Sequence, residues 1–116
     1  MKKYAIGCLF LFAGIPAFSA TTYTIEQLKQ MFDSGTSPVT MTPKLIFSAH
    51  NLPTLDGCIN WIKIKMEPYS GYPRKIEMDG SLGQYNVKLY TETERLTFDC
   101  IIAPDINGSV YSASYQ

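Results

Sequence analysis

The single histidine of this 116-residue chain, His50, is the side chain best suited to proton transfer. Imidazole changes its charge near neutral pH more readily than any other side chain. Ser48 and Asp56 lie nearby in the sequence, so a Ser-His-Asp triad is nominally available. However, Ser48 and His50 belong to one local segment, and no G-x-S-x-G elbow presents a serine. Catalysis by His50, as in a small secreted hydrolase or toxin, is therefore an alternative hypothesis.

Two carboxylates, Glu92 and Glu94, lie two positions apart. Paired carboxylates act as acid and base in glycoside hydrolysis. Here they fall at a predicted hairpin tip beside Arg95, where solvated charges are expected. The sequence also shows no metal-ligand spacing and no glycine-rich phosphate loop. We therefore assign no catalytic residue, metal site or cofactor, and lean against an enzyme.

Residues 1–19 have the pattern of a secretory signal peptide. A basic start at Lys2 and Lys3 precedes an apolar run over residues 4–15, and small residues allow cleavage after Ser19 or Ala20. The run is shorter than the roughly 20 apolar residues that span a bilayer. We predict a bacterial protein that is periplasmic or secreted, with no stable membrane insertion after signal removal. Residues 20–116 would then form a single small domain.

Removing this signal also removes Cys8 and leaves Cys58 and Cys100. An even cysteine count in an exported chain favours a disulfide, and two cysteines allow one pairing. Closing this loop would stabilise the fold by about 4 kcal/mol on the chain-entropy model. Without a CxxC spacing or a nearby histidine, a reactive or metal-binding thiol pair is disfavoured.

The charge balance gives no sign of nucleic-acid binding. Ten Lys and Arg residues less Lys2 and Lys3 leave 8, against 10 Asp and Glu, so the exported part carries about −2. Nucleic-acid binders usually show a basic excess or patch. The expected partner is another protein.

The chain contains eight tyrosines and one tryptophan, and several fall in predicted turns or on polar strand faces. Tyr, Trp and Arg are enriched in binding hot spots. The candidate binding residues are Trp61, Tyr69, Tyr72, Arg74 and Tyr90. Alternatively, these tyrosines reflect the strand preference of tyrosine, and another element covers that face of the sheet.

Three runs alternate apolar and polar residues as half-buried strands do: residues 61–66, 85–90 and 95–102. Cys100 shares a face with Leu96 and Phe98, which predicts a sulfur in the core. Turn residues separate the runs at positions 68–73, 79–83 and 91–94. Such short connections favour an antiparallel meander.

Residues 24–32 are predicted to form an amphipathic helix. Thr24 and Gln27 have the spacing of a capping box, and Gly35 can end the helix. The apolar stripe, which should pack on the sheet, consists of Ile25, Leu28, Met31 and Phe32.

Residues 36–57 are harder to assign. Residues 44–48 fit either a short strand or the start of a second helix, and residues 53–57 resemble a turn leading to Cys58. After Cys100, residues 104–108 contain Asn-Gly, a strong hairpin signal. Residues 109–115 would form the last strand, paired with residues 96–102.

Together these patterns predict an α+β fold: an N-terminal helix on an antiparallel sheet of about four or five strands, with one disulfide. The leading functional hypothesis is an exported, non-catalytic binding protein, such as an inhibitor or immunity protein that blocks another protein. A third hypothesis is an envelope assembly accessory that uses residues 109–115 as an edge for strand addition. We assign the sequence to no known family.

Overall fold

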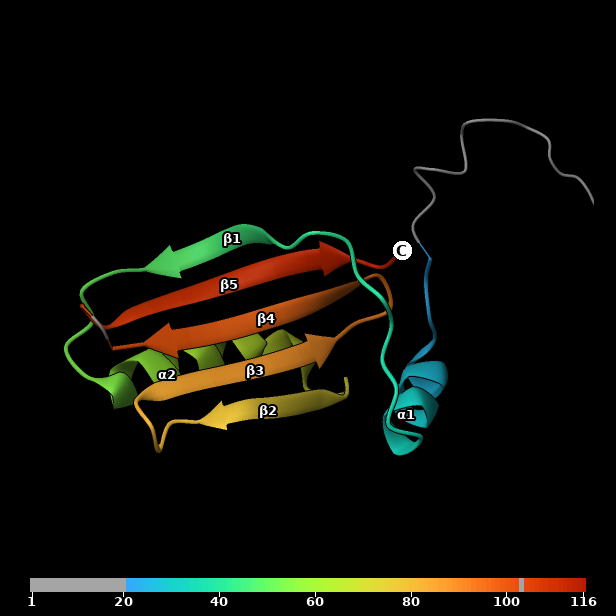
Figure 1. Ribbon diagram of the computed structural model, residues 1–116, viewed down its shortest axis with the longest axis horizontal. Coiled ribbons are helices and arrows are strands. Elements are labelled where there is room, and N and C mark those ends of the chain that lie inside the picture. The colour runs from blue at the N-terminus through green and yellow to red at the C-terminus, as the bar shows by residue number, and fades with distance from the viewer. Residues whose placement is uncertain (1–20, 103) are drawn as a thin grey trace, which may run out of the picture.

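Five antiparallel strands form one sheet in the order β1-β5-β4-β3-β2 (Figure 1). The computed structural model describes residues 21–102 and 104–116, so the predicted signal segment, its cleavage sites and Cys8 lie outside the described residues. The strands are β1 (Lys44–Ala49), β2 (Arg74–Asp79), β3 (Gln84–Tyr90), β4 (Glu94–Ile101) and β5 (Asn107–Ser114). With the helices described below, this confirms the predicted α+β fold class.

The C-terminal strands β3, β4 and β5 follow the predicted meander. Leu96, Phe98 and Cys100 are buried on one face of β4, as the alternation indicated. The strand ends at Ile101, and Ile102 is exposed, so the prediction extended β4 one residue too far. The turn after β2 is also confirmed, with positive φ at Gly80 and Gly83.

Two strands were unassigned or uncertain from the sequence. Residues 44–48 prove to be strand, since β1 pairs with β5 along its length. The strand β2 was not predicted, although Ile76 and Met78 alternate with charged residues. Both outer strands carry a register shift, between Leu45 and Phe47 in β1 and between Ile76 and Met78 in β2.

The prediction of a strand at residues 61–66 is wrong, because these residues end the helix α2 (Leu55–Met66). The residues 53–57 predicted as a turn contain the helix start: the Thr54 hydroxyl caps it by accepting from the Gly57 amide at 2.9 Å. Ile62 and Met66, one helical turn apart, are buried, while Ile64 is 62% exposed. The buried side chains of α2 therefore recur with helical spacing. Within the last six residues, the same sequence also happens to alternate between apolar and polar residues as a strand does.

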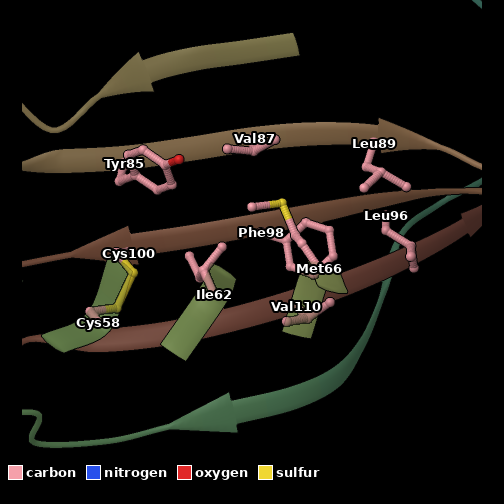
Figure 2. Close-up of a cluster of buried hydrophobic side chains, with 10 residues drawn as sticks. All are labelled: Cys58, Ile62, Met66, Tyr85, Val87, Leu89, Leu96, Phe98, Cys100 and Val110. Atoms are coloured by element: carbon pink, nitrogen blue, oxygen red, sulfur yellow. A yellow bond between two sulfur atoms is a disulfide. The ribbon is translucent and has the colours of Figure 1, made fainter. Parts of the chain in front are cut away.

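The helix α2 covers one face of the sheet (Figure 1), and the main core lies between the two (Figure 2). The core consists of Cys58, Ile62, Met66, Tyr85, Val87, Leu89, Leu96, Phe98, Cys100 and Val110. The predicted disulfide is present and joins the first turns of α2 to β4, with its two Cα atoms 6.1 Å apart. We call the opposite face, which α2 leaves uncovered, the open face.

The predicted N-terminal helix is α1 (Ile25–Asp33), and its capping box between Thr24 and Gln27 is confirmed. It packs at the end of the sheet (Figure 1), where Leu28 joins the buried Tyr90 and Tyr115 in a second core. The short 3-10 helix η3 (Glu67–Tyr69) follows α2. No helix within residues 21–102 and 104–116 is long and apolar enough to cross a membrane.

The final strand β5 lies inside the sheet, between β4 and β1. It therefore offers no free edge, and the prediction that residues 109–115 could add a strand is wrong. Asn107 and Gly108 are also not the hairpin turn that their sequence suggested, because both belong to β5. Gly108 is buried there and pairs with Cys100.

Candidate functional site

The strand β1 and the segment before it expose an unusual amount of apolar surface. Many of the large hydrophobic side chains exposed on the described part of the chain lie in one short segment. These are Val39, Met41, Leu45, Ile46 and Phe47, which we call the apolar edge. Contiguous exposed apolar side chains on a soluble protein commonly mark a protein-interaction site.

Backbone hydrogen bonds fix the apolar edge to the end of the chain. The amide of Met41 donates to the carbonyl of Ser114 at 2.8 Å, and the amide of Gln116 donates to the carbonyl of Val39 at 2.9 Å. Beyond them, β1 pairs with β5 from Lys44 onward. The segment is thus held extended along one border of the sheet.

The two faces of β1 differ in their surroundings. Phe47 lies opposite Val110 on the face that α2 covers, and the Lys65 amine lies 4.5 Å from the centre of the Phe47 ring. The same amine lies 5.8 Å from the centre of the Trp61 ring, so both rings attract one cation. Leu45 lies opposite Tyr111 on the open face.

An outer strand presents a row of backbone donors and acceptors along its free side. In the part of the chain that the structure describes, β1 has a partner on one side only. An extended peptide could therefore add as a sixth strand, with its side chains beside Leu45 on one face and Phe47 on the other. The opposite border, β2, carries the exposed ion pair Lys75–Glu77 at 3.8 Å, which discourages such pairing.

Three of the predicted binding residues, Tyr69, Tyr72 and Arg74, lie together at the far end of α2. One guanidinium nitrogen of Arg74 donates to the Tyr69 carbonyl at 2.6 Å, and the other donates to the Met66 sulfur at 3.9 Å. The rings of Tyr69 and Tyr72 are 6.2 Å apart. Arg74 thus holds the chain after η3, so at least part of its role is structural.

The Tyr72 hydroxyl donates to a carboxylate oxygen of Glu92 at 2.6 Å. This hydrogen bond is the main cause that raises the pKa of the Tyr72 phenol above its ordinary value. Glu94 instead accepts from the Ser112 hydroxyl. The two glutamates therefore have different hydrogen-bond partners, Tyr72 for Glu92 and Ser112 for Glu94.

The other two predicted binding residues lie elsewhere. Trp61 is half-buried on α2 and belongs to the neighbourhood of Phe47 and Lys65, beside the apolar edge. Tyr90 is buried against α1, where its ring meets that of Phe32 edge-on at 5.1 Å. The five predicted residues thus do not form one surface, and a binding role for them stays a prediction.

His50 is exposed in the connection between β1 and α2. Within the described chain its side chain makes no hydrogen bond to Ser48 or Asp56, and no three His, Cys, Asp or Glu side chains gather as a metal site would require. Asp56 lies in the first turn of α2, where the positive end of the helix dipole stabilises its carboxylate. No observed contact favours the alternative hydrolase hypothesis.

No family model matches the sequence, and searches of curated proteins and of solved structures found no match. Function is therefore inferred from the surface itself. The sequence did carry a signal for the apolar edge: three consecutive apolar residues, Leu45, Ile46 and Phe47, in a short strand. A run of this kind also fits a buried strand, and only the sheet order shows that β1 lies at the border.

Proposed function

We propose that the protein is an exported, non-catalytic binding protein that captures another protein through the apolar edge. The observation that carries the proposal is the exposure of Leu45, Ile46 and Phe47 on a border strand. Leaving these side chains in water forfeits the free energy that their burial would release. A partner that covers them recovers it, and an inhibitor or immunity protein would use such a surface.

Export is supported by the signal-like pattern of residues 1–19 and by the Cys58–Cys100 disulfide. Disulfides form and persist mainly in oxidising compartments, such as the bacterial periplasm or the exterior. The periplasm or the medium is thus the proposed place of action.

The partner contact we propose is an extended segment that pairs with the free side of β1. Its apolar side chains would pack beside Leu45 and Phe47. Lys44 begins the strand, and the Lys65 amine lies over Phe47. Acidic residues flanking the partner segment would therefore complement this border, since opposite charges across an interface favour correct register.

The test compares capture by matched variants of the oxidised protein in envelope and culture-supernatant extracts. The double variant Leu45→Thr/Phe47→Thr keeps strand-forming residues and removes the apolar contacts. The control is Ile76→Thr, because Ile76 on the opposite border is 55% exposed, as is Leu45. We expect one stoichiometric protein that wild type and the control retain and the double variant loses.

A photo-crosslinking residue at position 46 then identifies the contact. Crosslinks confined to one extended segment of the partner support strand addition. Equal capture by the double variant and the control, or crosslinks that map to no single segment, would exclude the apolar edge as the binding site.

A further inference from the structure

A second surface lies on the open face, over β2, β3 and β4. Residues 35–37, just after α1, form a pocket of about 350 Å³ with β2, β3 and β4. Its charged lining includes Lys75, Lys88 and Arg95, one from each of these strands. Pockets of this volume are at the lower end of the range that holds small organic ligands.

The pocket is strongly positive in a chain of net charge +0. Three basic side chains line it against one carboxylate, that of Glu77, so it holds an excess of two positive charges (3 − 1). Glu77 is already paired with Lys75 at 3.8 Å. Within the described residues, Lys88 and Arg95 have no ion-pair partner.

Lys75 and Lys88 lie directly opposite each other on β2 and β3. Like charges directly opposite on neighbouring strands destabilise a sheet. This arrangement therefore costs stability, which is common where residues serve binding instead of folding.

Arg95 has a polar atom without a hydrogen-bond partner among the residues that the structure describes. Its Nε atom is buried and makes no hydrogen bond in the described part of the chain. A buried donor without an acceptor is costly, more so when it carries charge. Arg95 lines the pocket, and guanidinium groups match the geometry of carboxylate and phosphate oxygens, so an oxyanion in the pocket is the ligand that this side chain suits.

The remaining wall of the pocket is aromatic. Phe32 from α1 and Tyr90 from β3 both line it, and their rings meet edge-on with centres 5.1 Å apart. An anion held by Arg95 would thus have an apolar surface beside it, which suits a ligand with a small organic part.

We propose that this pocket binds a small dianionic organic molecule, a phosphate monoester or a dicarboxylate. Arg95 and Lys88 hold its oxygens, Lys75 completes the charge, and Phe32 packs against its carbon portion. Two negative charges match the excess of two positive charges. The pocket shares no residue with the apolar edge, although Ser37 in its lining comes two positions before Val39.

The test uses the protein purified with its disulfide formed and follows backbone amide NMR signals during titration. The probes are phenyl phosphate and succinate at constant ionic strength, with sodium chloride as the reference. We expect saturable shifts confined to the residues around the pocket, weaker at high salt. The probe that binds more tightly identifies the anion type. No saturable shift with either probe overturns the proposal.

Two variants locate the site, with a third as control. Arg95→Gln and Lys88→Gln should each weaken binding at least about tenfold, because each removes a charged hydrogen-bond donor. Lys44→Gln, on the distant border strand, should bind as wild type does. Unchanged binding in Arg95→Gln and Lys88→Gln would also overturn the proposal.

A stability measurement separates binding from a structural role. If Lys88 serves binding, Lys88→Gln should raise the melting temperature at low salt, because it relieves repulsion from Lys75. At the same concentration, the better probe should raise the melting temperature of wild type more than that of Lys88→Gln, because the variant binds it more weakly. A lower melting temperature for Lys88→Gln, with probe-induced stabilisation retained, would contradict the proposed role of Lys88.

Discussion

The ring of Trp61 on α2 lies directly against the backbone of Gly108 on β5. A Cβ atom at position 108 would lie 2.7 Å from ring carbons of Trp61 and 3.1 Å from the Cys58 sulfur. Real Cβ atoms do not approach so closely, so the helix can reach the sheet here only because residue 108 lacks a side chain. This contact fixes where α2 crosses β5, beside the disulfide.

Gly108→Ala should therefore destabilise the protein by about 1–3 kcal/mol, the usual cost of overpacking a tight contact. Urea denaturation followed by Trp61 fluorescence measures the change. Gly71→Ala is the control, because a Cβ there meets nothing within 4 Å. Equal stability of the two variants would show that α2 shifts freely over β5.

The disulfide should contribute about 4 kcal/mol, since it closes a loop of 42 residues in sequence separation. The double variant Cys58→Ala/Cys100→Ala, which buries no new polar group, should lower the free energy of unfolding by about that amount. Both sulfurs are fully buried, so reducing agent should react slowly unless denaturant is present. A variant as stable as the oxidised wild type would contradict the estimate.

The Thr54 cap should matter for the whole fold, because α2 supplies three of the ten buried residues of the main core, Cys58, Ile62 and Met66. Thr54→Ala removes the acceptor of the Gly57 amide and should cost about 1 kcal/mol. Thr54→Ser keeps a hydroxyl and should restore most of the loss. Thermal unfolding by circular dichroism distinguishes the three proteins.

Tyr115 near the C-terminus is fully buried, and its hydroxyl lies 2.7 Å from the Thr91 carbonyl, to which it donates. Tyr115→Phe should cost about 1–3 kcal/mol, because the buried carbonyl loses its partner. Chemical denaturation at neutral pH measures this cost. A variant of wild-type stability would show that water replaces the hydroxyl.

Tyr115 also leads us to predict that the protein loses stability at alkaline pH. Burial, with a smaller effect of Tyr90 and Glu94, raises the pKa of Tyr115 well above its ordinary value of 10.0. The folded state keeps a proton that the unfolded state releases above about pH 10, so this contribution is complete below that pH and falls as pH rises. The loss should approach about 1.4 kcal/mol per pH unit. Denaturation series at rising pH should fall less steeply for Tyr115→Phe.

Arg74→Ala should destabilise the protein by about 1.5–3 kcal/mol, since its charged hydrogen bond holds the Tyr69 carbonyl. Lys63→Ala, on the exposed side of α2, is the control. Measuring partner capture at a temperature where both variants are folded then separates structure from binding. Capture that is lost in folded Arg74→Ala and kept in Lys63→Ala would support the predicted binding role.

Local sequence patterns were enough to predict those elements whose own residues carry the information, without reference to distant parts of the chain. The capping box at Thr24 and Gln27 specified the start of α1, because it uses hydrogen bonds within four residues. The alternation of β3 and β4 specified which side chains face the core. The cysteine count specified the disulfide, because only one pairing was possible.

The helix α2 shows where local pattern failed. Its last six residues alternate as a strand would, while the inward positions Cys58, Ile62 and Met66 recur every four residues. The longer stretch that starts at Thr54 contains both the N-cap residue and these three positions at four-residue spacing, and it therefore favours a helix. Six residues, 61–66, are too few to distinguish the two-residue period of a strand from the roughly 3.6-residue period of a helix.

Only the tertiary structure decided which strands lie at the borders of the sheet and which side chains face each other on neighbouring strands. Strand order depends on pairings between distant segments, such as β1 with β5, and no local pattern encodes them. The same pairings expose Leu45 and Phe47, set Lys75 opposite Lys88 and bring Trp61 onto Gly108. The sequence thus determined the fold class and the covalent link, and the packing of distant segments determined both candidate binding surfaces.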